Sequence, residues 1–177
     1  MINLAKAENK VGGWLKSAPH LPKNWQRWIA ENAWWIVLVG IIALAISIMS
    51  GLDNVAKYMT FVGNASSYLG LYVTSPYAAG WIFSAIISLS LATIVVILLA
   101  SAISAIKEQQ KKGWERLFIA LMICAVSILI GAFLTFNVFD FIFNAIFGGI
   151  GLTIVAYFIF EIRSYFVGSA RHVTVKK

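Results

Sequence analysis

The chain has 177 residues, of which 60% are hydrophobic and 12% are charged, whereas an ordinary soluble domain carries about 25% charged residues. A water-soluble fold of this length could not bury so much apolar surface, so we expect one domain that uses lipid as part of its solvent. The net charge of +7 could indicate nucleic-acid binding in a soluble protein, but here the basic residues flank apolar segments. We therefore expect no nucleic-acid partner.

Residues 1–31 form a basic N-terminal segment with five Lys or Arg and two Glu. Its first part is weakly patterned, and Gly12-Gly13 argues against one long helix. After Pro22, apolar residues at positions i, i+3 and i+4 share one helical face, namely Trp25, Trp28 and Ile29. This spacing predicts a short amphipathic helix in the headgroup layer, with its tryptophans toward lipid as interfacial anchors. The alternative is a simple basic lead-in to the first membrane span.

Residues 32–52 carry no charge and predict the first transmembrane helix, with Trp34 and Trp35 at its start as further interfacial anchors. A helix of this length spans about 30 Å, which is the thickness of the hydrocarbon core. We expect Gly51 and Asp53 to end the helix.

The region 53–80 is the most ambiguous part of the chain. Its first apolar residues follow a helical spacing, but Gly, Asn and Ser then dilute the apolar run. We interpret the region as a short helical outer loop that is partly sunk in the interface. A re-entrant segment and a further membrane crossing are the alternatives.

Three more apolar segments predict the remaining transmembrane helices, at residues 81–106, 117–139 and 141–162. Trp81 and Trp114 lie near the ends of these segments, where aromatic residues anchor helices at the interface. The predicted fold is therefore all-α, an integral membrane four-helix bundle over residues 32–162. Residues 163–177 are predicted to form a basic cytoplasmic tail.

The charges indicate the orientation of this predicted bundle. Thirteen of the fourteen Lys and Arg residues lie in the N-terminal segment, the central charged loop Lys107–Arg116 and the tail, whereas Lys57 alone lies on the other side. The positive-inside rule then places both termini in the cytoplasm. The same distribution predicts attraction to anionic lipid headgroups on the cytoplasmic side of the bilayer.

Each predicted span contains small residues at positions i, i+4 and i+8, a spacing that allows close helix packing. The four lines are Ala43, Ser47 and Gly51; Ser84, Ser88 and Ala92; Ser127, Gly131 and Thr135; and Ala145, Gly149 and Thr153. We interpret them as packing positions of the bundle. The glycines at 148, 149 and 151 could alternatively form a flexible point or a pore wall.

The sequence predicts no catalytic residue, cofactor site or metal site. His20 and His172 lie in opposite tails, and Ser104-Ala105-Ile106-Lys107 matches Ser-x-x-Lys without the companion motifs of the enzymes that use it. Glu161 lies close to Arg163, so we expect a surface ion pair there, with a gating carboxylate as the alternative. We expect no enzyme.

From Lys111 to Phe166, the pattern Lys-Lys-Gly-Trp-x-x-Leu-Phe, a glycine-containing span and Phe-x-x-Glu-Ile-Arg-Ser-Tyr-Phe follow one another. This part of the chain resembles the second half of small four-span bacterial membrane proteins of uncharacterised function. The resemblance implies an integral protein of a bacterial inner membrane and assigns a role to no residue.

Two functional hypotheses follow from these features. The first is a structural or interaction subunit that self-associates as a homo-oligomer or joins a membrane protein partner, favoured by charge-free spans with small-residue lines. The second is a channel or transporter for a small solute, with its pore inside an oligomer or lined by Ser84, Ser88, Ser127, Thr135 and Thr153. The second lacks a charged group within the spans that could couple transport to an ion or proton.

Overall fold

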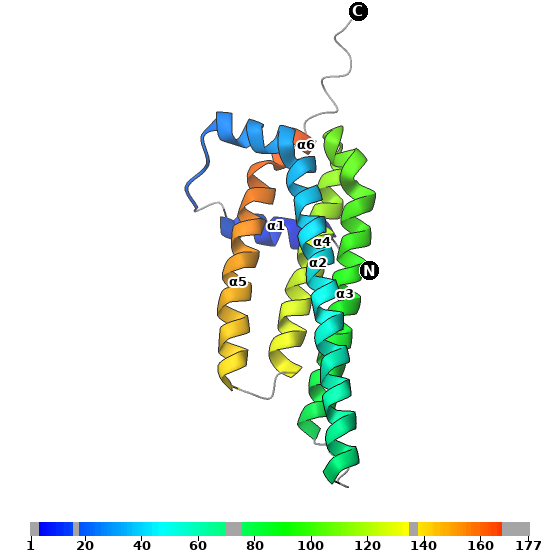
Figure 1. Cartoon of the computed structure of the whole chain (residues 1–177). Helices are drawn as coiled ribbons and strands as arrows, with labels where there is room; N and C mark the ends of the chain where they lie inside the picture. Colours follow the sequence, from blue (N-terminus) through cyan, green and yellow to red (C-terminus); the bar gives the residue numbers. More distant parts are fainter. Residues whose placement is uncertain (1–3, 16–17, 70–75, 135–137, 168–177) are drawn as a thin grey trace, which may run out of the picture.

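A computed structural model of the chain describes residues 4–15, 18–69, 76–134 and 138–167. Within these ranges all regular secondary structure is helical, which confirms the all-α class. The helices are α1 (Leu4–Leu15), α2 (Lys23–Leu69), α3 (Pro76–Lys107), α4 (Lys111–Leu134), α5 (Val138–Glu161) and α6 (Arg163–Val167) (Figure 1).

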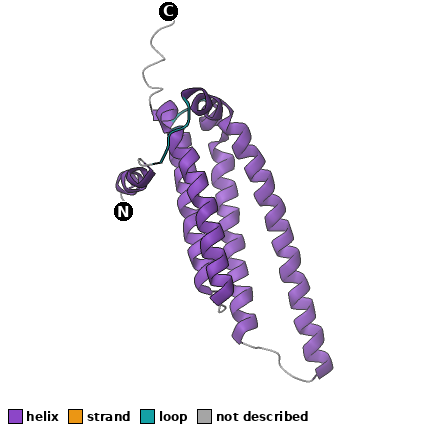
Figure 2. Cartoon of the chain, turned by 90° about the vertical axis from the view of Figure 1, so that its left-hand side faces the viewer, coloured by secondary structure: helices purple, strands orange, loops and turns teal. Residues whose placement is uncertain are grey.

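Four of these helices are long and apolar enough to cross a membrane, in agreement with the four predicted spans. Helix α2 packs on α3, α3 packs on α4, and α4 packs on α5, whereas α2 and α5 make no extended contact with each other. Figure 2 shows α2 leaning away from the other long helices. The four helices therefore form an open row with α2 and α5 at its edges, because the last pairing of a closed four-helix bundle is not made.

Helix α2 is continuous over 47 residues, so the prediction that Gly51 and Asp53 end the first helix is wrong. A glycine inside a helix costs only about 1 kcal/mol, and here Gly51 lies where a Cβ would come within 2.7 Å of the Leu89 side chain of α3. Asp53 pairs with Lys57 at 2.6 Å, one turn further along the helix. Both residues thus have roles inside the helix.

The first turns of α2 run across one end of the row and then bend into its long part (Figure 1). The short helix predicted after Pro22 is therefore the beginning of α2 and not a separate element. We call residues 18–31 the crossing arm. The end of the molecule that holds this arm, the α3–α4 turn and α6 is called the basic end.

Helix α1 runs through Gly12-Gly13, where the sequence pattern argued against a long helix. Ala7, Val11 and Leu15 pack against the buried core at a spacing of about one turn, so α1 has one apolar face. Gly12 allows a close approach to α5, because a Cβ there would lie 3.1 Å from the Phe160 ring. The sequence of α1 has a weak intrinsic preference for helix, and its contacts with the core and with α5 stabilise it.

The other predicted boundaries differ by a few residues. Helix α3 begins at Pro76 instead of residue 81, and α4 covers Lys111–Leu134 instead of 117–139. Phe139 belongs to α5, which begins at Val138. The α3–α4 turn ends in paired hydrogen bonds, from Gln110 N to Ala105 O and from Gln109 N to Ile106 O, with Gln109 at φ 53°. This Schellman geometry closes the helix end in the central charged loop.

Helix contacts also fix the relative heights of the four long helices. Gly51 meets Leu89, the Tyr58 and Trp81 ring centroids lie 4.7 Å apart, and Gly113 meets Ala105. By this register the end of α4 at Leu134 lies level with about residue 84 of α3 and residue 56 of α2. Residues 57–69 of α2 therefore extend about 20 Å beyond the α4–α5 pair, and residues 76–83 of α3 extend about 12 Å beyond it, as Figures 1 and 2 show. We call this extension the far hairpin.

Candidate functional site

An apolar groove with a volume of about 1060 Å³ lies between α2 and α5. Val37 and Leu44 of α2 form one wall, and Leu152 and Val155 of α5 form the other. The floor is made by α4 and α3, through Leu117, Leu121, Cys124 and Ile128 of α4 and Val95 and Leu99 of α3. The groove exists because α2 and α5 are the unpaired edges of the open row.

The crossing arm closes the groove at the basic end. Leu21, Pro22, Trp25, Trp28 and Ile29 of the arm line this end of the hollow. A smaller recess of about 380 Å³ adjoins it, lined by Asn24 and the same two tryptophans. The groove thus has an apolar body and an end where polar and aromatic side chains meet.

Glu161, the last residue of α5, fastens the crossing arm to the end of the row. One carboxylate oxygen lies 2.6 Å from Nδ1 of His20, and the other accepts hydrogen bonds from the backbone N–H of Leu21 at 2.9 Å and from Nε2 of Gln26 at 2.8 Å. The Glu161 side chain is only 6% exposed. Its buried oxygens are therefore satisfied by the arm, as buried carboxylates require.

Two tyrosines strengthen this connection. The hydroxyl of Tyr157 donates to the carbonyl of Pro19, and the hydroxyl of Tyr165 donates to the carbonyl of Lys23 at 3.3 Å. Together with Glu161 they tie the arm to α5 and α6 over one continuous stretch. We call this set of contacts the arm clamp.

The expected surface ion pair between Glu161 and Arg163 is wrong. Glu161 is buried against the arm, and Arg163 instead pairs with Glu8 of α1. The reason is geometric, because His20 and Gln26 reach Glu161 from more than 130 positions earlier in the chain. No local spacing in the sequence signals such a contact.

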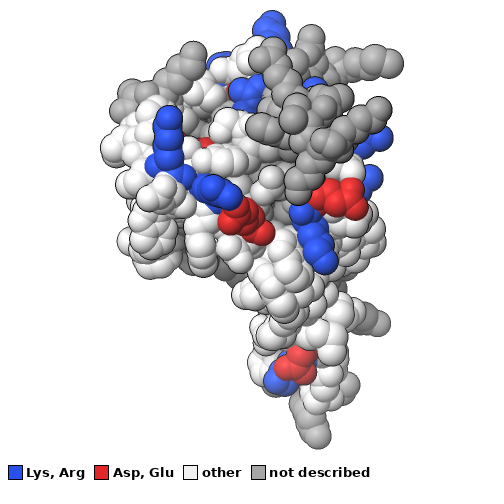
Figure 3. All heavy atoms as spheres, turned by 90° about the horizontal axis from the view of Figure 1, so that it is seen from above, with Lys and Arg blue, Asp and Glu red and all other residues white. Residues whose placement is uncertain are grey.

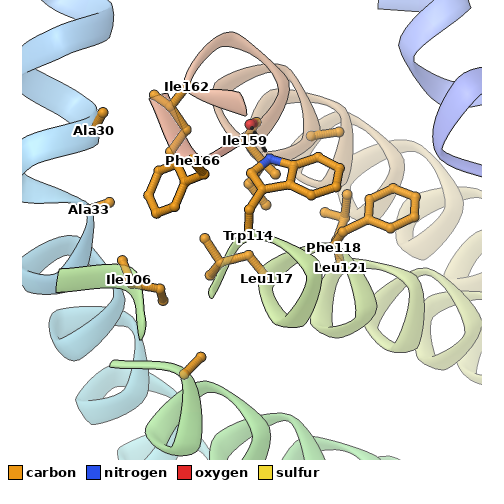
Figure 4. Packing of buried hydrophobic residues seen from close by; sticks show 12 residues of the cluster. Ala30, Ala33, Ile106, Trp114, Leu117, Phe118, Leu121, Ile159, Ile162 and Phe166 are labelled. Atoms are coloured by element: carbon orange, nitrogen blue, oxygen red, sulfur yellow. Dashed lines mark hydrogen bonds between the residues drawn. The ribbon is translucent and has the colours of Figure 1, made fainter. Parts of the chain in front are cut away.

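The buried core lies beside the clamp at the basic end. Trp114, Phe118, Ile106 and Phe166 are its largest fully buried side chains. Figure 4 shows the Trp114 indole directed toward α5, where its Nε1 donates to the carbonyl of Ile159 at 2.9 Å. The prediction of Trp114 as an interfacial anchor is thus wrong: the residue is 1% exposed and packs inside the core.

The other predicted anchors lie near the helix ends. Trp25 and Trp28 are more than half exposed on the crossing arm, and Trp35 is also exposed. Trp34 is half-buried, with Nζ of Lys107 5.2 Å from its ring centroid. At the other end of the row, the Trp81 ring lies 4.7 Å from the Tyr58 ring, between centroids, at an interplanar angle of 44°. The role of these tryptophans as interfacial anchors stays a prediction.

The small-residue lines fall on different surfaces. Gly51 meets α3, and Ser84, Ser88, Ala92, Ser127 and Gly131 are partly buried. In contrast, Ala43, Ser47, Ala145 and Thr153 are exposed, a Cβ on Gly149 would meet nothing within 4 Å, and Thr135 lies outside the described residues. Ser47 and Thr153 bond the carbonyls one turn earlier, on Ala43 and Gly149.

Two glycines outside those lines also make close helix approaches. A Cβ on Gly113 would lie 2.8 Å from the backbone of Ala105 and Ile106, and one on Gly148 would lie 2.9 Å from Ile128. The i, i+4, i+8 spacing of small residues predicted that α5 packs through Gly149. The contact with Ile128 of α4 is made by Gly148, the residue before it. The Gly113 contact depends on the α3–α4 turn, which small-residue spacing within a span does not describe.

Charge is concentrated at the basic end. Of the ten Lys or Arg in the described residues, nine lie on α1, on the crossing arm, around the α3–α4 turn or on α6, and the five described Glu lie in the same region. Figure 3 looks onto this end and shows Lys and Arg side chains around it, with Asp and Glu beside several of them. Within the described helices, Lys57 is the single basic residue at the opposite end, where it pairs with Asp53. The basic end therefore presents net positive charge.

The candidate site consists of the apolar groove and the positively charged basic end beside it. Among the described residues, no three His, Cys, Asp or Glu side chains come together as a metal site. Cys124 lines the floor of the groove as a half-buried thiol. An apolar hollow with a polar end is suited to binding an amphipathic molecule.

Comparison with known proteins gives no match, whether to a protein family, to a curated sequence or to a solved structure.

Proposed function

We propose that the chain is a multi-pass membrane protein that acts as a structural or interaction subunit, binding a membrane protein partner or a second copy through the far hairpin. The observation that carries this proposal is the length of α2 and α3. The apolar part of α4, residues 117–134, is about 27 Å long and covers most of the hydrocarbon core. Most of the length of about 20 Å by which α2 extends past α4 then lies beyond the core.

The side chains of the far hairpin favour a protein-binding role. Met59 and Phe61 are 57% and 69% exposed, respectively. Apolar side chains grouped outside the hydrocarbon core are typical of interaction surfaces, because a partner removes them from water. Lys57 and Asp53 form an ion pair beside this surface and bring no net charge to it.

The charge distribution supports an orientation for this proposal. Positive residues favour the cytoplasmic side of spans, so the basic end faces the cytoplasm and the far hairpin faces outward. The N-terminal segment and the tail are then cytoplasmic, and a bacterial inner membrane fits the resemblance of the second half of the chain. Anionic headgroups on the cytoplasmic side add attraction for the basic end.

The channel hypothesis has less support from the described residues. The groove walls are apolar, and the hydroxyls of Ser47, Ser90 and Thr153 donate to carbonyls of their own helices. Transport through an oligomer stays an untested prediction.

A photo-crosslinking experiment tests the interaction role. A benzophenone amino acid placed at Phe61 in cell membranes should give one discrete adduct, identified by mass spectrometry as a second copy or one recurring partner. The same probe at Ile97 is the matched control, because this residue of α3 is 64% exposed but lies within the predicted hydrocarbon core. Equal adducts at both positions, or none at Phe61, would contradict the proposal.

A further inference from the structure

The groove between α2 and α5 has the depth of one bilayer leaflet. On α4 its floor runs from Leu117 to Ile128, and on α5 its wall runs from Phe147 to Ile159, which correspond to about 17 and 18 Å along the helices. Half of the hydrocarbon core is about 15 Å. The groove begins at the basic end and stops near the middle of the row.

This depth distinguishes between two occupants of an apolar groove in a membrane. A partner's transmembrane helix crosses the whole core of about 30 Å and needs walls along its full length. Acyl chains of one leaflet extend from the headgroup layer only to the bilayer centre. A hollow that is confined to one half of the row therefore fits lipid chains better than a spanning helix.

The closed end of the groove has features suited to a lipid headgroup. The recess beside it is lined by Asn24, Trp25 and Trp28, which combine an amide with two exposed indole rings. Lys23 is the residue before Asn24 on the crossing arm, and its side chain is exposed. Arg27 lies between the two tryptophans in the sequence and pairs with Glu31 at 2.8 Å. With nine Lys or Arg against five Glu at this end, the charge complements an anionic headgroup.

We propose that the groove binds a single anionic phospholipid of the leaflet at the basic end. Its acyl chains lie between α2 and α5 on the floor formed by α4, and its phosphate lies beside the crossing arm at Lys23. The arm clamp at Glu161 holds the arm in place above the chains. This binding is independent of the far hairpin and of any partner there.

Two glycines of α5 provide a matched test of the proposed lipid site. Gly151 lines the groove and Gly149 does not, and a Cβ on either would meet no heavy atom within 4 Å. Gly151→Leu thus adds a side chain at the groove from a position with open space at the Cβ, whereas Gly149→Leu adds the same side chain elsewhere on the same helix. Each variant is reconstituted in discs of equal phosphatidylglycerol and phosphatidylethanolamine and released for native mass spectrometry.

The wild-type chain should retain one phosphatidylglycerol molecule, and Gly149→Leu should do the same. Gly151→Leu should reduce retention about tenfold or more, because the added isobutyl group occupies the space of the acyl chains. Lys23→Gln should lower the preference for phosphatidylglycerol over phosphatidylethanolamine about fivefold, which corresponds to ~1 kcal/mol for one basic residue near the headgroup. Lys57→Gln, at the opposite end, should leave that preference unchanged.

Retention that is equal in the Gly151→Leu and Gly149→Leu variants would overturn the proposal. Loss of a bound protein chain, instead of a lipid, in Gly151→Leu would assign the groove to a partner helix and would also overturn it. An unchanged headgroup preference in Lys23→Gln would refute the assigned position of the phosphate.

Discussion

Replacement of Glu161 by alanine is expected to release the crossing arm and to lower the free energy of unfolding by about 3–5 kcal/mol. The change leaves His20, the N–H of Leu21 and Gln26 without their common acceptor. If the arm stays in place, these donors lose their hydrogen bonds to a charged carboxylate. If the arm detaches, the donors can bond to water, but the arm loses its packing against the row. Thermal unfolding in detergent and hydrogen exchange of residues 19–29 measure the two effects.

Glu31→Ala is the matched control for the arm clamp. Glu31 is on the same arm and pairs with Arg27, but both side chains are half or more exposed. Its loss should change stability by no more than about 0.5 kcal/mol and leave exchange in the arm unaltered. Similar losses for Glu161→Ala and Glu31→Ala, or unchanged exchange in Glu161→Ala, would show that the clamp does not hold the arm.

The second large effect is expected at Trp114. Trp114→Ala removes a fully buried indole that stacks on Phe118 at 5.5 Å, and should cost about 3–5 kcal/mol. Trp114→Phe keeps an aromatic ring but loses the hydrogen bond to the carbonyl of Ile159, so its cost should be about 1–2 kcal/mol. Denaturant titration of each variant in detergent gives these differences.

Trp35→Ala provides the comparison for Trp114, because Trp35 is 51% exposed near the same end of the row. If both tryptophans served as interfacial anchors, as the sequence predicted, their replacement would have similar effects. We expect a loss of less than about 1 kcal/mol at Trp35. Equal losses at the two positions would refute the placement of Trp114 in the core.

The sequence predicted the helical class and four membrane-spanning segments because these depend on local hydropathy. A run of about 20 apolar residues must satisfy its backbone within the helix, whatever its neighbours are. The end of the first helix was predicted wrongly because Gly51 and Asp53 weaken a helix only slightly. Contact with Leu89 and the ion pair with Lys57 are sufficient to continue it.

The groove and the arm clamp depend on tertiary contacts that no local pattern contains. Glu161 and His20 are 141 residues apart and meet because α1, the crossing arm and α5 converge at the basic end. Trp114 was assigned to the interface from its position beside Lys111 and Lys112, although its helix face determines its burial. The spacing of small residues likewise predicts the contacting face of a helix with an error of about one residue. In α5 it predicted Gly149, whereas Gly148 makes the contact.

The most direct test of the account is the side of the membrane on which each end of the row lies. In a Cys124→Ala background, single cysteines at Asn64 on the far hairpin and at Gln110 in the α3–α4 turn are both exposed positions. A membrane-impermeant maleimide added to intact cells should label Asn64→Cys, whereas Gln110→Cys should react only after permeabilisation. Labelling of Gln110→Cys in intact cells, with Asn64→Cys protected, would reverse the orientation and contradict the outward-facing hairpin and the cytoplasmic basic end.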